Sequence, residues 1–114
     1  MIVTTTPFVA AHRIVESKGQ CFGLVVRSRG LAGNITASLR SLVGGEIKEY
    51  TELLEDTRRQ ALDRMVQNAT LMGANAVVSM RFDSSELNNS MSEIVAYGTA
   101  VVIEPDAGAS QPVE

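Results

Sequence analysis

The segment 93–104 most constrains the fold, because it predicts a β-strand with two apolar faces. Side chains of a strand alternate between the two faces of its sheet, so residues of equal parity share a face. One face takes Ile94, Ala96, Ala100 and Val102, and the other takes Val95, Tyr97, Val101 and Ile103. A strand that is apolar on both faces is typical of the centre of a covered sheet. We therefore expect this strand to lie between two others, with a covering layer on each side.

The residues before this segment predict a second strand and a polar connection. Within residues 74–83, the even-numbered positions are apolar and include Ala76, Val78, Met80 and Phe82. This alternation predicts a strand with one apolar face. Residues 84–92 are mostly serine, asparagine and glutamate, and they predict a loop between the two strands.

Residues 13–27 are rich in β-branched and apolar side chains, interrupted by Gly19 and Gly23. A hairpin turn at Lys18-Gly19 would be unusual, because two-residue turns favour Asn-Gly or Asp-Gly. One long strand bent at its glycines and a two-stranded hairpin both fit this segment, and we favour the bent strand. The threonine-rich residues 1–7 either add an edge strand or lie over the surface.

Two helices are expected between these strands. Apolar residues at helical spacing predict the first helix in residues 31–43, and Gly44 and Gly45 end it, since glycine adopts the left-handed conformation of a helix end without strain. The second helix begins near Ile47 and continues to Met72, where Gly73 ends it. Its apolar stripe contains Tyr50, Leu54, Ala61, Met65, Ala69 and Met72.

These elements predict an α+β fold: a small antiparallel three-stranded sheet with helices on one face. The chain order is strand, broken long helix, strand, strand, and the order in the sheet is 1-3-2. Residues 1–104 form a single domain, and residues 105–114 form a flexible C-terminal tail. Helices on one face leave the other face of the last strand uncovered, and the sheet has two open edges. We therefore expect a ring-forming subunit, in which the sheets of neighbouring copies join.

Composition excludes several partners. The net charge is −3 and the basic residues are scattered, so a nucleic-acid partner is not expected. No apolar run approaches the ~18 residues of a membrane span, and the N-terminus lacks the layout of a signal peptide, so we expect a cytoplasmic protein without a membrane partner. The single cysteine, Cys21, excludes an internal disulfide and fits a reducing compartment.

The sequence resembles the YbjQ family, whose members are uncharacterised and described as "putative heavy-metal-binding". The resemblance lies in residues 42–54, 61–65, 71–78 and 93–101, which include the Gly44-Gly45 pair, the run Gly-Ala-Asn-Ala-Val at 73–77 and the run Gly-Thr-Ala-Val at 98–101. It implies a dodecin-like subunit, with the long helix broken at the glycine pair, and a homo-oligomeric ring that is expected to be a pentamer.

The sequence alone does not name a reaction, and it identifies no catalytic residue and no metal ligand. A ligand-binding site is placed by hypothesis at the joint between the helices, where backbone amides and acids meet: Gly44, Gly45, Glu46, Glu49 and Tyr50. The function expected is a module that binds a metal ion or small ligand, with the cofactor unknown. The alternatives are a purely structural ring without a ligand and an enzyme with a site between subunits, and we expect a protein that is not an enzyme.

Overall fold

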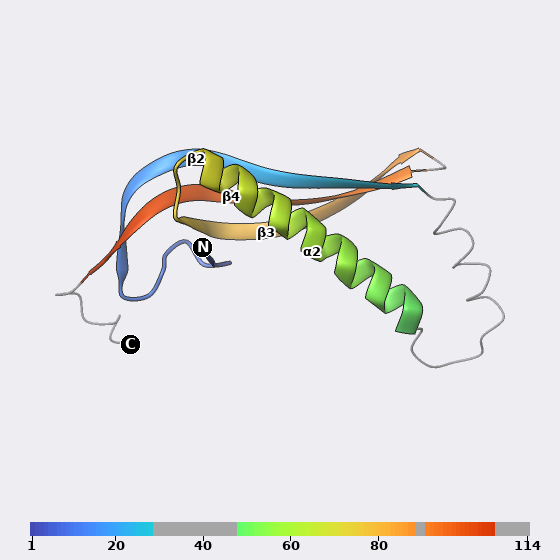
Figure 1. The fold of residues 1–114 in the computed structure, drawn as a ribbon, viewed down its shortest axis with the longest axis horizontal. Helices are drawn as coiled ribbons and strands as arrows, with labels where there is room; N and C mark the ends of the chain where they lie inside the picture. The colour runs from blue at the N-terminus through green and yellow to red at the C-terminus, as the bar shows by residue number, and fades with distance from the viewer. Residues whose placement is uncertain (29–47, 89–90, 107–114) are drawn as a thin grey trace.

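The computed structural model describes residues 1–28, 48–88 and 91–106. These residues form strands β1 (Ile2–Val3) and β2 (His12–Ser28), helix α2 (Lys48–Leu71), and strands β3 (Ala76–Asn88) and β4 (Met91–Pro105). Figure 1 shows one long sheet with α2 lying across it. The α+β class is confirmed. The first predicted helix, residues 31–43, and most of the predicted tail lie outside the described residues.

Strand β4 lies inside the sheet, as its two apolar faces predict. The strand order is β1-β3-β4-β2, and β4 is antiparallel to both neighbours. The prediction of a three-stranded antiparallel sheet with the order 1-3-2 is wrong in detail, because β1 adds a fourth strand that runs parallel to β3. The threonine-rich N-terminus extends this pairing, since Thr4 N donates to Val77 O at 2.9 Å and Ser79 N donates to Thr6 O at 2.9 Å.

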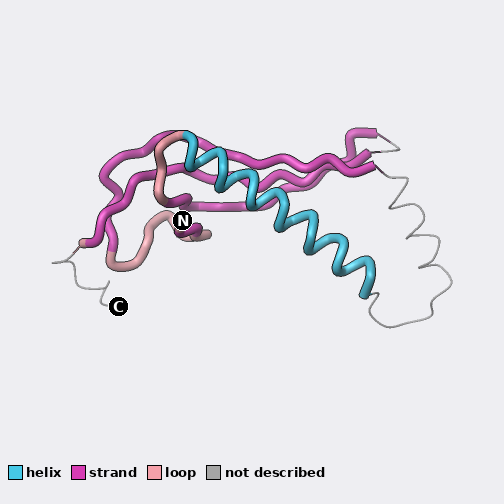
Figure 2. The backbone as a smooth tube through the Cα atoms, viewed as in Figure 1, coloured by secondary structure: helices cyan, strands magenta, loops and turns pink. Residues whose placement is uncertain are grey.

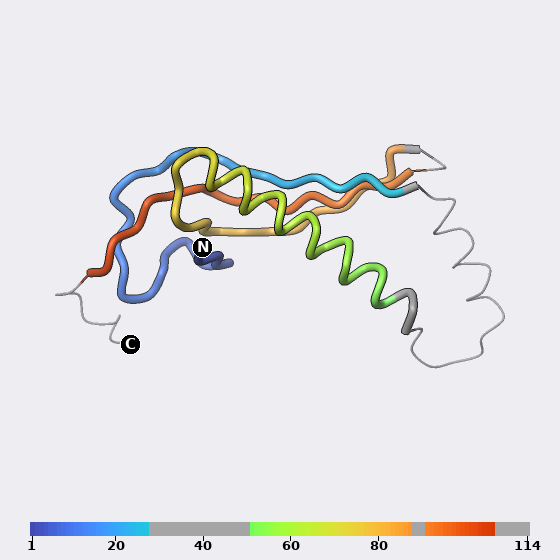
Figure 3. Tube along the Cα trace, in the orientation of Figure 1, coloured from blue at the N-terminus to red at the C-terminus, as the bar shows by residue number. Residues whose placement is uncertain are grey.

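Strand β2 is a single bent strand, so the hairpin alternative for residues 13–27 is wrong. Its register against β4 shifts between Ile14 and Glu16 and again between Ser17 and Gly19. Gly19 has a φ of +110°, a conformation that glycine adopts without strain. The two irregularities bend the N-terminal third of β2, which curls away from the flatter part of the sheet (Figure 3).

Strands β3 and β4 are longer than predicted, because the polar residues 84–92 are not mainly a loop. Strand β3 continues to Asn88 and β4 begins at Met91, so the polar residues pair across the two strands. Ser85 lies opposite Glu93, and its Oγ donates to Glu93 Oε1 at 3.0 Å. Backbone pairing forms here without an apolar face, which is why periodicity did not reveal it.

An irregularity at Ser79 overturns the predicted alternation of β3. The register shifts between Val78 and Arg81, and Ser79 has a φ of 54°. As a result, Val77 and Met80 both belong to the core under α2, whereas Val78 packs on the opposite face. A bulge of this kind moves the following residues to the other face of the sheet.

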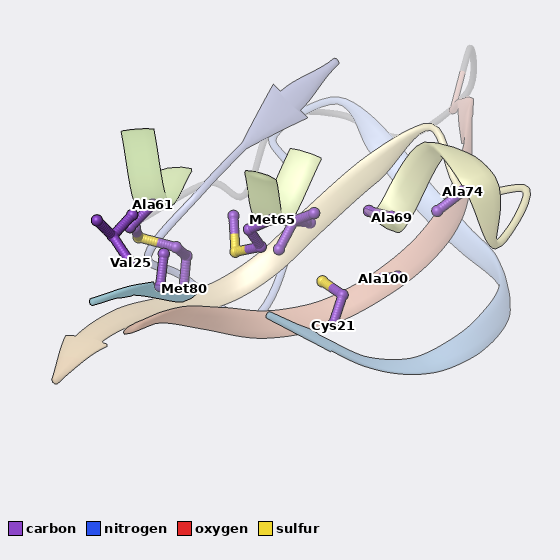
Figure 4. Packing of buried hydrophobic residues seen from close by; sticks show 10 residues of the cluster. Cys21, Val25, Ala61, Met65, Ala69, Ala74, Met80 and Ala100 are labelled. Atoms are coloured by element: carbon purple, nitrogen blue, oxygen red, sulfur yellow. The ribbon is translucent and has the colours of Figure 1, made fainter. Parts of the chain in front are cut away.

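Helix α2 packs closely against β2 and β4 through small and flexible side chains (Figure 4). Ala61, Met65 and Ala69 are fully buried, as the predicted stripe requires, but Leu54 is 42% exposed. Gly73, with a φ of +87°, follows the helix end. No helix in the described part of the chain is both long and apolar enough to cross a membrane.

A second, smaller core lies on the face of the sheet opposite α2. Val9, from the segment between β1 and β2, joins Val78, Val101, Ile103 and Ala76 in this cluster. Figure 2 shows the N-terminal loop lying beside one end of the sheet. The N-terminal segment therefore covers the face opposite α2 at that end only.

Replacing Asn75 with alanine is expected to destabilise the fold by roughly 1–3 kcal/mol. Asn75 Nδ2 donates to Ile103 O at 3.0 Å, and Ile103 N donates to Asn75 Oδ1 at 2.8 Å, so the side chain satisfies both backbone groups of a buried residue. Urea unfolding measures the loss. Asn75→Asp keeps the acceptor and should give an intermediate value; equal stability of the wild type and Asn75→Ala would contradict the role.

Candidate functional site

The described structure does not test the predicted ligand-binding site. Gly44, Gly45 and Glu46 lie outside the described residues. Glu49 and Tyr50 lie in the first turn of α2, but their side chains are not among those the structure describes. The hypothesis of a site at the joint between the helices therefore stays a prediction.

A cavity lies between α2 and the distal part of the β3–β4 hairpin. It has a volume of about 600 Å³. Figure 1 shows that the N-terminal half of α2 diverges from the sheet at this end. We call this cavity the groove beside α2. The groove is lined by the charged residues Arg58, Asp83, Glu86 and Glu93, by apolar Leu54, Phe82 and Ile94, and by serines.

Several side chains that line this groove can form hydrogen bonds or ionic contacts with a polar ligand. The Arg58 guanidinium lies 5.3 Å from the centroid of the Phe82 ring, a cation–π contact that holds the charge at the wall of the groove. The Asp83 carboxylate accepts from Ser84 N at 2.9 Å. One arginine beside several carboxylates and hydroxyls can hold a small polar ligand by hydrogen bonds.

The described residues do not fit a site for a thiophilic heavy metal within one chain. Soft metals are held by clusters of thiolates and imidazoles. Cys21 is 2% exposed, with its Sγ 3.7 Å from Gly98 O, and His12 directs Nδ1 to Ala10 O at 2.7 Å. The described ranges contain no group of three or more His, Cys, Asp or Glu side chains that could hold a metal ion.

Cys21 is expected to be unreactive in the folded protein. Burial raises the pKa of its thiol, which disfavours the nucleophilic thiolate. We expect negligible reaction with Ellman's reagent under native conditions and complete reaction in urea, whereas a Leu71→Cys variant, at a position 86% exposed, reacts at once. Because the folded-state pKa is raised, stability should fall as the pH rises above about 8.5, the ordinary thiol value. Rapid native labelling of Cys21 would contradict its burial.

Among the residues that the structure describes, an exposed apolar patch lies on the face of the sheet opposite α2, beyond the end covered by the N-terminal segment. Phe22 (54% exposed), Leu24 (40%) and Val26 (46%) line β2, and Tyr97 (42%) lies directly opposite Phe22 on β4. Val95, half-buried, lies opposite Leu24. We call these five residues the bare face.

Sequence reasoning identified only the β4 half of this surface. It predicted that Val95, Tyr97, Val101 and Ile103 require cover, and the second core covers Val101 and Ile103. It missed the β2 half. The signal was present in residues 21–26, where the small residues Cys21 and Gly23 alternate with the larger Phe22 and Leu24.

A family model and several relatives match this chain over most of its length. A family model described as "Putative heavy-metal-binding" matches residues 1–104. A UPF0145 protein of Bradyrhizobium sp. (strain ORS 278) is 69% identical over 105 residues, covering 92% of this chain and 95% of the relative. A UPF0145 protein of Methanoregula boonei is 57% identical over 113 residues, covering 99% and 94%.

The fold is also found in a solved structure. A crystal structure of a protein of unknown function from Pediococcus pentosaceus, of the DUF74 family, superposes with a TM-score of 0.58 at 17% identity, covering 91% of this chain and 98% of that one. At this identity the likeness concerns the fold alone. The match of the family model to nearly the whole sequence, together with relatives above half identity, establishes the conclusion that the residue motifs suggested: this chain belongs to the YbjQ family.

Proposed function

We propose that the protein is a subunit of a homo-oligomeric ring, and that the groove beside α2 in each subunit is a binding site for a small polar ligand. The family resemblance favours five copies. The main support for the proposed ring is the bare face, where two neighbouring strands expose large apolar side chains next to each other.

Covering the bare face is energetically favourable. Apolar surface removed from water contributes about 25 cal/mol per Å², and stable interfaces bury about 800 Å² on each partner. A contiguous apolar patch of several strand residues is typical of a protein–protein contact. A second copy of the chain supplies apolar surface of matching character, and a cyclic arrangement gives every copy the same contact.

The groove supports the ligand-binding part of the proposal. Arg58 and three acidic residues line a cavity of about 600 Å³, which falls within the range of roughly 300–1,000 Å³ for small-molecule sites. The mixed charge favours a ligand with both donors and acceptors over a bare heavy-metal ion. A role without catalysis is part of the proposal, and the chain's single histidine and single cysteine support it.

Native mass spectrometry of the protein as purified tests both parts at once. The mass of the intact complex gives the number of copies, and any additional mass that gentle activation releases gives the ligand. A ring with a releasable small organic ligand would support the full proposal. A ring without added mass, before and after incubation with cell extract metabolites, would support a purely structural ring, and a monomer would contradict the proposal.

A matched variant localises the ligand. Arg58→Ala removes the charge at the wall of the groove, whereas Arg13→Ala removes an exposed arginine from the far end of β2, where it pairs with Glu104. If the groove holds the ligand, the first variant should lose the added mass and the second should keep it. Equal retention in both variants would place the ligand elsewhere.

A further inference from the structure

The outer edge of β2 is covered in its centre by two side chains of α2. Arg64 Nη1 donates to Leu24 O, and Asn68 Nδ2 donates to Phe22 O at 2.7 Å. These residues are four apart on the helix, so they lie on the same side of α2. They reach across from the helix to the backbone of an edge strand.

The two carbonyls are those that a partner strand would need. In an antiparallel ladder, alternate residues direct their backbone groups toward the paired strand and away from it. Phe22 and Leu24 are alternate residues, and β4 is the strand paired with β2. The carbonyls bonded to Arg64 and Asn68 therefore belong to the outward-facing set of the β2 edge.

This edge would otherwise favour uncontrolled association. Strand β2 is 17 residues long and carries exposed Phe22, Leu24 and Val26 on one face. Long apolar edge strands add strands from other molecules and lead to aggregation unless a structural feature prevents it. A charged arginine and an amide above the edge are such a feature.

We infer that Arg64 and Asn68 close the β2 edge to strand addition, so that copies of this chain meet through the bare face and not by extending the sheet at the centre of β2. The inference refines the proposed ring by assigning residues that determine how copies meet. Under this inference, the sheets of neighbouring copies do not join along the centre of the β2 edge, because Arg64 and Asn68 occupy it.

The first test replaces Arg64 and Asn68, which we call the capping residues because they cover the β2 edge. Arg64→Ala/Asn68→Ala should change a single discrete species into a polydisperse population in light scattering and raise thioflavin T fluorescence severalfold on incubation. The control Arg59→Ala/Gln67→Ala removes an arginine and an amide from exposed positions of the same helix and should behave as the wild type. A double capping variant with the wild-type mass and no dye signal would overturn the inference.

The second test needs no variant and holds even if the double variant fails to fold. In the assembled wild type, the outward-facing amides of Phe22 and Leu24 should exchange with deuterium at least about 100-fold faster than the paired amides of Cys21 and Gly23. Slow exchange at Phe22 and Leu24 would show strand addition at this edge and overturn the inference. A wild-type monomer would instead contradict the proposed ring, while the dye and exchange results would still decide the role of the two capping residues.

Discussion

Replacing Gly23 with alanine is expected to lower the free energy of unfolding by about 3 kcal/mol or more, the largest single effect we predict. A Cβ at this position would collide with the backbone of α2, at Ala61 O and Met65 N, and would lie 2.8 Å from Arg64 Cβ. Backbone atoms of a packed helix cannot rotate away, so the helix must move. Urea or thermal unfolding followed by circular dichroism measures the loss.

Gly19→Ala separates steric collision from backbone strain. Gly19 has a φ of +110°, and a Cβ there would meet only Met72 Cε at 3.9 Å. Its replacement should therefore cost about 1–2 kcal/mol, from backbone conformation alone. Equal losses at Gly19 and Gly23 would contradict the close approach of α2 to β2. Gly23→Ala should also withdraw Arg64 and Asn68 from the β2 edge, since both reach it from the displaced segment of the helix.

Replacing Phe22 and Tyr97 with serine is expected to dissociate the assembly into monomers while the subunit stays folded. The two side chains lie opposite each other on the bare face, and both are more than 40% exposed in the single chain. Each buried aromatic or aliphatic side chain contributes about 1.5–3 kcal/mol, so losing two at each interface weakens it by at least about 100-fold. Sedimentation velocity measures the change in association.

Leu71→Ser is the matched control for this variant. Leu71 is the most exposed large apolar residue of the described chain, at 86%, and it lies at the C-terminal end of α2 rather than on the bare face. The control should sediment as the wild type does. If Leu71→Ser dissociates the assembly and the Phe22/Tyr97 variant does not, the interface lies elsewhere.

The sequence predicts the parts of the fold that depend on apolar periodicity. The two apolar faces of residues 93–104 placed β4 inside the sheet, and the stripe through Ala61, Met65 and Ala69 placed one face of α2 in the core. The poor turn signal at Lys18-Gly19 correctly favoured a single bent strand. The positions of β4 and α2 follow from burial, which apolar periodicity reports directly.

Features that depend on backbone hydrogen bonds were missed. The bulge at Ser79 changes the face of the following residues without changing the local composition. The extension of the β3–β4 hairpin uses polar residues, and the parallel pairing of β1 depends on where β3 begins in space. The groove beside α2 arises from the angle of the helix to the sheet. Only the β4 half of the bare face was predicted, because Phe22 and Leu24 were not assigned to a face of the sheet. No local pattern encodes the bulge, the strand extension, the pairing of β1 or the angle of the helix, whereas the alternation in residues 21–26 did carry a signal for the bare face.

Multi-angle light scattering of the wild-type protein at micromolar concentration tests the central claim most directly. The chain has a mass of 12.2 kDa. A single species with an integral multiple of that mass, expected to be a pentamer, would agree with copies that cover the bare face of one another. A single species of 12.2 kDa would contradict it.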